Sequence, residues 1–164
     1  MGRALQRAAD VEFIDIDVAI ERAEGMTTGE IFDTLGETVF RQKEAETLQT
    51  AALPTSTVKI IACGGGTPCF GQNLDFMLCN GTVVWLEASL PVTLRRIREA
   101  GDTRPLLAGK SDYELERFVA EHYAMRIPFY AKAHERFESS HLETPSQIDA
   151  AVEQFISRFG LTKR

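Results

Sequence analysis

Short apolar runs alternate along the chain with longer stretches in which apolar residues recur every three or four positions. The first pattern is typical of buried strands and the second of amphipathic helices. The predicted strands span residues 12–16, 58–62, 82–87 and 134–139. The predicted helices span residues 3–9, 17–24, 28–35, 37–52, 73–78, 91–100, 112–125 and 145–159. Because strands and helices alternate throughout, the pattern predicts an α/β fold with a mostly parallel sheet.

Capping residues predict where several of these helices begin and end. A Ser or Thr followed three residues later by Glu or Gln forms a capping box, which indicates a helix start. The pairs are Thr27–Glu30, Ser111–Glu114 and Thr144–Gln147. Gly25 and Gly36 predict helix ends. The helix that begins at Asp112 is expected to end at Arg126, just before Pro128, because the residue preceding a proline disfavours the helical conformation.

Three consecutive glycines, Gly64, Gly65 and Gly66, follow the apolar strand predicted at 58–62. Glycine loses more conformational freedom on folding than any other residue, so such a run is costly unless the backbone must approach another group closely. A glycine-rich turn at the carboxyl end of a parallel strand is also where open α/β sheets bind their ligands. We therefore expect these glycines to line a binding site.

The composition is that of an ordinary globular protein. The 164 residues favour a single domain spanning 1–164, with 44% hydrophobic and 26% charged residues. The formal net charge of −6 argues against nucleic-acid binding, which needs a basic face, and favours a small-molecule partner. The three cysteines form no CxxC pair, and no apolar run is long enough to span a membrane. These features predict a cytoplasmic protein.

Two carboxylates, Asp15 and Asp17, stand two positions apart at the end of the first predicted strand. If the strand continues through Asp17, both side chains lie on one face at its carboxyl end. Near the glycine run they would be placed to hold a magnesium shell and to orient a hydroxyl group. The alternative is that both are solvated residues at a surface strand end.

Three arginines are candidates for binding an anionic ligand, and each has a structural alternative. Arg41 shares a helical stripe with Phe40 and Glu44, which favours a pocket, although an exposed i,i+3 ion pair is the commoner arrangement. Arg104 lies in a loop with glycine and proline, where a guanidinium on a lid would meet a transferred phosphoryl group; otherwise it is a solvated charge. Arg126 would bind a ligand or stabilise a helix C-terminus.

No segment matches the phosphate-binding pattern G-x-x-x-x-G-K-[ST] between a strand and a helix. The Gly-Lys-Ser at 109–111 has Arg104 in place of the first glycine, and no strand precedes it. Residues 66–73 have the glycine spacing, but Gln72 replaces the lysine and Pro68 removes a backbone donor. The triple glycine is therefore expected to form a substrate-side wall rather than the primary nucleotide cradle.

Six motifs occur in a fixed order between about residues 2 and 139. They are FIDID with AIE (13–17, 19–21), GEIF (29–32), GETVFRQKE (36–44), CGGG (63–66), TRPLLAG (103–109) and MRIPFY (125–130). Together they resemble the shikimate kinase family, and six motifs in the same order are highly specific. The resemblance implies a three-layer P-loop kinase fold around a five-stranded parallel sheet. It also implies ATP-dependent phosphorylation of shikimate, in the route to chorismate and the aromatic amino acids.

The resemblance further implies which residues bind shikimate. Asp17 would bind its hydroxyls and is the candidate base for the hydroxyl that is phosphorylated. Arg41 and Arg126 would clamp its carboxylate, and Glu44 would orient Arg41. The pocket wall is expected from the other matched positions, which are Gly64, Gly65, Gly66, Phe32 and Phe40.

On the nucleotide side, the resemblance implies that Arg104 is a catalytic arginine that faces ATP, on a lid loop around 101–111. Arg98 is expected near the adenine, and Asp15 in the magnesium and water shell. These roles describe a monomer that uses Mg²⁺ as cofactor and ATP as co-substrate.

The chain departs from the family pattern at its beginning. Family members start with the central strand of the sheet and a G-x-x-G-x-G-K-[ST] loop before the helix that matches 3–9, and the sequence contains neither. The amides, lysine and metal of that loop stabilise a transferred phosphoryl group. Three hypotheses remain: a shikimate kinase whose chain is truncated at its N-terminus, an inactive relative that binds shikimate, and another small-molecule kinase of the same superfamily.

Overall fold

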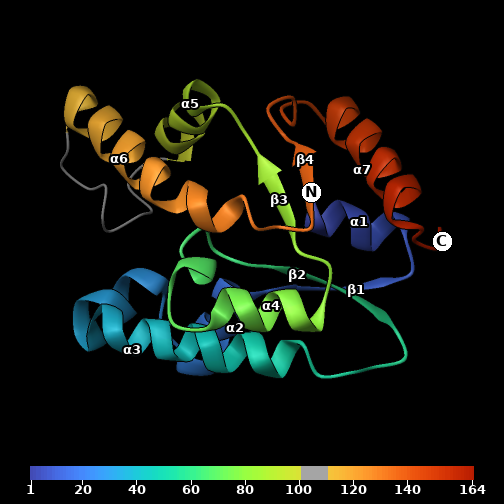
Figure 1. The fold of residues 1–164 in the computed structure, drawn as a ribbon, viewed down its shortest axis with the longest axis horizontal. Helices are drawn as coiled ribbons and strands as arrows, with labels where there is room; N and C mark the ends of the chain where they lie inside the picture. Colours follow the sequence, from blue (N-terminus) through green and yellow to red (C-terminus); the bar gives the residue numbers. More distant parts are fainter. Residues whose placement is uncertain (101–110) are drawn as a thin grey trace.

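The computed structural model describes residues 1–100 and 111–164, and it confirms the α/β class (Figure 1). The helices are α1 (Gly2–Ala8), α2 (Ile16–Glu24), α3 (Thr28–Ala51), α4 (Asn73–Asn80), α5 (Leu90–Ala100), α6 (Asp112–Tyr130) and α7 (Pro145–Phe159), with a short 3₁₀ helix η1 (Thr67–Cys69). The strands are β1 (Val11–Asp15), β2 (Val58–Ala62), β3 (Val84–Glu87) and β4 (Glu135–Glu138). In the part of the chain that the structure describes, no helix is long and apolar enough to cross a membrane.

The four strands form two parallel pairs. β1 pairs with β2 in a register that places Val11 opposite Val58, and β3 pairs with β4 with Val84 opposite Glu135. Within the described residues, no backbone ladder joins β2 to β3. Figure 1 shows the β1–β2 pair in the half of the molecule that contains α2, α3 and α4, and the β3–β4 pair in the half that contains α5, α6 and α7.

The register of the first pair determines where the site can form. Asp15, the last residue of β1, lies opposite Ala62, the last residue of β2. Both strands therefore end at the same edge, because their directions are parallel. The segment that begins at Asp15 and the glycine run that follows Ala62 leave the sheet side by side.

Three apolar clusters hold the helices against the strands. The first, under α2 and α3, contains Ile16, Ile20, Ile31, Phe40, Leu48 and Ala51. The second contains Ala4, Leu5, Ala9, Val11, Phe137, Val152, Phe155 and Ile156. The third, between α5 and α6, contains Leu94, Ile97, Leu115 and Val119. The second cluster includes Val11 of β1 and Phe137 of β4, so α1 and α7 connect the two strand pairs through buried contacts.

The first strand begins and ends one residue earlier than the pattern predicts. β1 ends at Asp15, whose carboxylate accepts a hydrogen bond from the N–H of Val18 (3.3 Å) and so caps α2. Asp17 consequently lies in the first turn of α2, and the expected shared strand face is wrong. A short carboxylate can bond the backbone three residues ahead, which competes with continuing the strand.

The sixth helix is longer than predicted, because it continues through Pro128 to Tyr130. Proline removes one N–H donor from a helix, yet the next bonds are kept, as the N–H of Ala131 donates to the carbonyl of Ile127 (2.8 Å). The expected helix end at Arg126 is therefore wrong. Residues 126 and 130 are one turn apart, so both side chains lie on one face of α6.

The predicted helix ends at two glycines are confirmed. Gly25 follows α2 in the left-handed conformation with φ 66°. Gly36 has φ 83° and ψ 165° inside α3, so the segment consists of two helical parts that meet at a kink. The second part carries the arginine and glutamate of the predicted stripe.

Candidate active site

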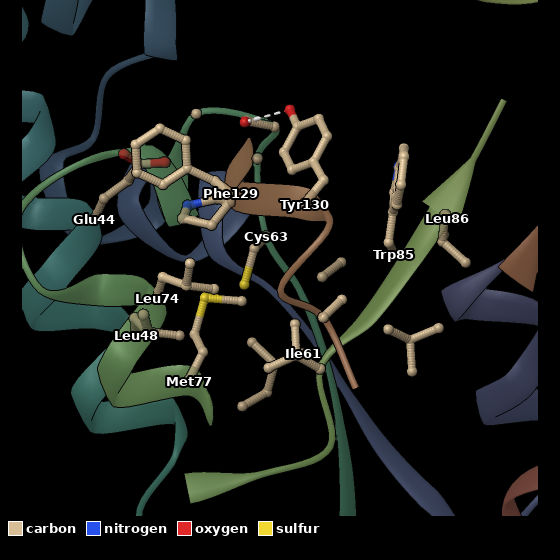
Figure 2. Close-up of a pocket in the computed structure, with 18 of the residues that line it drawn as sticks. Glu44, Leu48, Ile61, Cys63, Leu74, Met77, Trp85, Leu86, Phe129 and Tyr130 are labelled. Atoms are coloured by element: carbon tan, nitrogen blue, oxygen red, sulfur yellow. Dashed lines mark hydrogen bonds between the residues drawn. The ribbon is translucent and has the colours of Figure 1, made fainter. Parts of the chain in front are cut away.

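A cavity of about 950 Å³ lies between the two strand pairs. Ile61 of β2 lines one side of this cavity, and Trp85 and Leu86 of β3 line another (Figure 2). Tyr130 of α6 lies at one end of it (Figure 2), and the glycine run also belongs to its lining. Its charged lining residues include Asp17, Arg41, Glu44 and Arg126. The cavity therefore brings together candidate residues from α2, α3, α6 and the glycine run.

The first and last glycines of the run lie against charged side chains. A Cβ added to Gly66 would lie 2.8 Å from Nη1 of Arg41, which is too close, so any larger residue would displace the guanidinium. A Cβ added to Gly64 would lie 3.6 Å from Oδ1 of Asp17, which is ordinary contact. Neither glycine has a positive φ. At Gly66 the absence of a side chain thus provides space for Arg41.

The middle glycine, Gly65, is held by α6. The Tyr130 hydroxyl donates a hydrogen bond to its carbonyl (2.6 Å), the dashed line in Figure 2. A Cβ on Gly65 would lie 3.4 Å from Nη1 of Arg126. The Tyr130 ring packs on Trp85, with ring centroids 5.7 Å apart. The C-terminal part of α6 therefore brings Arg126 against the glycine run, and Tyr130 on the same helix face holds the run by a hydrogen bond.

Arg41 is held by two carboxylates and by aromatic rings. Its Nη1 donates to Oε2 of Glu44 (2.7 Å), and its Nε and Nη2 donate to Oε1 of Glu37 (3.2 and 3.0 Å). Its Cζ lies 4.1 Å from the ring centroid of Phe70 and 5.4 Å from that of Phe40. Its side chain is only 14% exposed. These bonds use three of the five guanidinium N–H groups and leave two for a ligand.

Glu44 is buried, with 1% of its side chain exposed, so the alternative of an exposed i,i+3 pair is wrong. Oε1, the oxygen not bonded to Arg41, accepts a hydrogen bond from Oγ1 of Thr67 (2.5 Å). The Thr67 carbonyl in turn accepts from Nδ2 of Asn73 (3.0 Å). A buried carboxylate is tolerated only when its oxygens are paired, and both oxygens of Glu44 are.

Asp15 at the end of β1 and Asp17 in the first turn of α2 differ in their surroundings. Burial raises the pKa of Asp17 above its ordinary value, and the carboxylates of Glu44 and Asp15 raise it further, while Arg41 lowers it. Asp15 uses one oxygen to cap α2. Among the described residues, no three His, Cys, Asp or Glu side chains are grouped so as to hold a metal ion.

The two aromatic candidates line the cavity, whereas Arg98 of the nucleotide-side candidates does not. Phe32 and Phe40 line the cavity with their ring centroids 4.7 Å apart. Arg98 is half exposed and pairs with Asp112 on α6 (3.2 Å), and it is not among the cavity-lining residues that the structure describes. Arg104 and residues 101–110 of the lid expected around 101–111 lie outside the described residues.

The structure adds four residues that the sequence analysis does not single out as site residues, namely Thr67, Phe70, Asn73 and Tyr130. Thr67 directly follows the glycine run, Phe70 and Asn73 lie three and six residues further on, and Tyr130 closes the motif that contains Arg126. Their positions in or soon after these motifs were the available signal. Their contacts join residues far apart in sequence, which local patterns do not reveal.

The chain has parallel strands between helices, with a glycine run and carboxylates where the strands end. Its structural neighbours are shikimate kinases, which have the P-loop kinase fold. The family model for shikimate kinase matches residues 1–158. A curated shikimate kinase from Phocaeicola vulgatus is 40% identical over 153 residues, which are 93% of this chain and 86% of that protein. The chain therefore belongs to the shikimate kinase family.

Solved structures of the family confirm the fold. The crystal structure of shikimate kinase from Bacteroides thetaiotaomicron superimposes with a TM-score of 0.85 at 38% identity, covering 98% of this chain and 88% of that one. Shikimate kinase from Acinetobacter baumannii in complex with shikimate gives a TM-score of 0.75 at 28% identity, with coverages of 97% and 84%. The predicted resemblance and fold are confirmed, and the roles of individual residues stay predictions.

Proposed function

We propose that the protein is an ATP-dependent kinase that phosphorylates a hydroxyl of shikimate bound in the cavity. The observation that carries the proposal is the glycine run, which has the Asp17 carboxylate at one end and the Arg41 guanidinium at the other, with Arg126 between them. A ligand lying along the run would meet cations and a carboxylate together. Shikimate has a carboxylate and several hydroxyls, and family membership makes it the expected substrate.

Two guanidinium groups would bind the shikimate carboxylate. Arg41 keeps two N–H groups for a ligand after bonding Glu44 and Glu37. Arg126 lies on α6, with its guanidinium close to Gly65. Charge-assisted bonds from two arginines hold a carboxylate in one orientation. They would therefore determine which side of the shikimate ring lies away from the arginines.

Asp17 would act at the hydroxyl that is phosphorylated. Its raised pKa makes its ionised form a stronger base than an exposed aspartate. Proton acceptance by a positioned carboxylate and alignment of the attacking oxygen are the contributions a protein makes to phosphoryl transfer on the acceptor side. Asp17 is thus the residue we assign as base.

Mg²⁺ is the cofactor expected of an ATP-using kinase, and the carboxylates of Asp15 and Asp17 fit it only in a limited way. They supply oxygen donors at one strand end, but the described residues offer no third ligand beside them. Mg²⁺ commonly keeps several waters and binds one or two carboxylates together with substrate phosphates. When bound, the ion would neutralise phosphate charge. Asp15 would face its water shell with the oxygen not used to cap α2.

Calorimetry of shikimate binding and a coupled assay of ADP formation test the proposal directly. We expect shikimate to bind the purified chain and Arg41→Ala or Arg126→Ala to weaken binding by about tenfold or more, because each removes charge-assisted bonds. Unchanged affinity in both variants would favour the third hypothesis, another small-molecule kinase of the superfamily. No shikimate binding by the unmodified chain would contradict the proposal.

A second candidate is a shikimate-binding protein without turnover, because the residues expected to bind shikimate, Asp17, Arg41 and Arg126, all line the cavity. It predicts shikimate binding that ATP and Mg²⁺ do not alter. Detectable ADP formation by the purified 164-residue chain, dependent on shikimate, would refute it. The hypothesis of a truncated chain stays a prediction, and it fails if the genomic DNA upstream of Met1 lacks in-frame codons for a strand and a G-x-x-x-x-G-K-[ST] loop.

Several properties remain predictions of this proposal. We expect a monomer that does not bind nucleic acid and is located in the cytoplasm, with a lid around 101–111 that carries Arg104. Light scattering, a nucleic-acid shift assay and cell fractionation check the first three. Arg104→Ala, expected to lower turnover more than shikimate affinity, checks the last.

A further inference from the structure

The segment after the glycine run contacts the arginine site from outside the cavity. Thr67 and Phe70 are absent from the cavity lining, yet each contacts the group that holds Arg41 or Arg41 itself. We propose that Thr67 and Phe70 are positioning residues for the Arg41 guanidinium. Thr67 acts through Glu44, and Phe70 acts by direct contact. The predicted effect on shikimate binding rests on the proposed function.

Thr67 fixes the carboxylate that orients Arg41. Its side chain is fully buried, and its hydroxyl donates to Oε1 of Glu44 while Oε2 accepts from Arg41. A carboxylate whose two oxygens bond donors on opposite sides loses the freedom to rotate. Without the Thr67 hydroxyl, Oε1 of Glu44 would be a buried acceptor that lacks its hydrogen-bond donor. The Glu44 carboxylate would then rotate toward a different donor.

Thr67 is itself held on both sides. Its N–H donates to the carbonyl of Gly64 (3.1 Å), and its carbonyl accepts from the buried amide of Asn73. The hydroxyl therefore has a fixed origin at the N-terminus of η1. A chain of hydrogen bonds runs from Asn73 through Thr67 and Glu44 to Arg41. Glu44 and Arg41 line the cavity, and Arg41 is the cation among these four residues.

Phe70, which directly follows η1, packs its ring against the guanidinium of Arg41. Its ring centroid lies 4.1 Å from Cζ of Arg41, closer than the centroids of Phe40 (5.4 Å) and Phe32 (5.9 Å). Phe70 is 37% exposed, which is unusual for a phenylalanine, and this contact accounts for its place at the surface. A ring face beside a cation attracts it and excludes water from one side.

Two hydroxyl-specific variants test the role of Thr67. Thr67→Val removes the hydroxyl at nearly constant shape, and Thr67→Ser keeps it. We expect Thr67→Val to weaken shikimate binding by about tenfold, and Thr67→Ser to stay within about twofold of the unmodified chain. The neutral methyl ester of shikimate should bind all three proteins alike. Equal loss for acid and ester, or no rescue by serine, would show a merely structural role and overturn the proposal.

A second measurement separates this proposal from the proposed function. The Nε–H signal of Arg41 in ¹H–¹⁵N spectra of the ligand-free protein reports whether the guanidinium is held. We expect this signal to broaden or shift strongly in Thr67→Val and to remain in Thr67→Ser. An unchanged signal in Thr67→Val overturns the proposal, whether or not shikimate binds. Failure of the unmodified chain to bind shikimate would instead contradict the proposed function alone.

Phe70 has its own matched control. Phe70→Leu removes the ring face and is expected to weaken shikimate binding by about threefold, whereas Phe70→Tyr keeps the face and should bind normally. Tyr113→Leu changes an exposed aromatic residue on α6 that is outside the site and should leave binding unchanged. Normal binding by Phe70→Leu would remove Phe70 from the proposal.

Discussion

Arg41 and Arg98 each pair with a carboxylate, but the two pairs have different surroundings. The Arg41–Glu44 pair has a 2.7 Å contact, with side chains 14% and 1% exposed. The Arg98–Asp112 pair has a 3.2 Å contact, with side chains 46% and 84% exposed. Water screens the second pair, which therefore contributes little, whereas the first is held among further hydrogen bonds and rings. Only the first arrangement can fix a guanidinium for a ligand.

The largest expected contrast between buried and exposed groups concerns two thiols. Burial, with the carboxylates of Glu44 and Asp17, raises the pKa of Cys63 from 9.0 to about 12, while Cys79 is exposed. Cys63 should thus contain about a thousandfold less thiolate than an ordinary thiol near neutral pH. Labelling with a disulfide reagent should show a fast phase that Cys79→Ser abolishes. A fast phase that disappears only in Cys63→Ser would break the comparison.

The next effect is on stability. Glu44→Ala should lower the free energy of unfolding by about 3 kcal/mol, because the largely buried guanidinium of Arg41 keeps only the half-exposed Glu37 carboxylate and the Thr67 hydroxyl loses its acceptor. Asp112→Ala, the matched change in the exposed pair, should lower it by less than about 1 kcal/mol. Urea denaturation measures both. Equal losses would mean that burial does not distinguish the two pairs.

Conservative substitutions of the two arginines sharpen the comparison for binding. Arg41→Lys should weaken shikimate binding by about tenfold, because an ammonium group cannot replace several directed N–H bonds and the ring contact. Arg98→Lys should leave shikimate affinity within about twofold. Calorimetry at one salt concentration provides both values. A larger effect of Arg98→Lys would place that residue at the shikimate site.

The smallest effect is a pH-dependent change in stability. The folded-state pKa of Asp17 is raised above its unfolded value of 3.8, so its protonated form stabilises the fold below that pH, and this stabilisation is lost as pH rises through the folded pKa. Asp17→Asn should therefore match the unmodified chain in acid and become the more stable of the two toward neutral pH. Denaturation at several pH values tests this. A difference that is constant across pH would contradict the raised pKa.

The fold was largely predictable because its signals are local. Apolar periodicity and capping boxes placed the strands and helices to within a few residues. The exceptions have local causes that compete with the pattern: Asp15 caps α2 instead of extending the strand, and α6 continues through Pro128. In both cases the structure makes a local backbone hydrogen bond that the pattern does not predict, from Val18 N–H to Asp15 and from Ala131 N–H to Ile127.

The site was predictable only in part. The stripe on α3 indicated Arg41 and Glu44, and the motifs indicated Arg126, but nothing local indicated that Thr67 bonds a carboxylate 23 positions away. Arg98 pairs with Asp112 at the surface, and its expected place near the adenine stays a prediction. Contacts between distant segments depend on the strand register, which hydrophobic patterning does not specify in detail.

The cavity between the strand pairs also has a consequence for self-association. Within the described residues, β2 and β3 each pair on one side only, so each has an edge whose backbone groups are available to another chain. Val58 and Leu86 on these strands are 54% and 48% exposed. Apolar strand edges of this kind are the usual starting points of aggregation. We expect the protein to be a monomer in dilute solution and to aggregate only at high concentration, and an apolar-to-lysine change at Leu86 to raise the concentration at which aggregation begins.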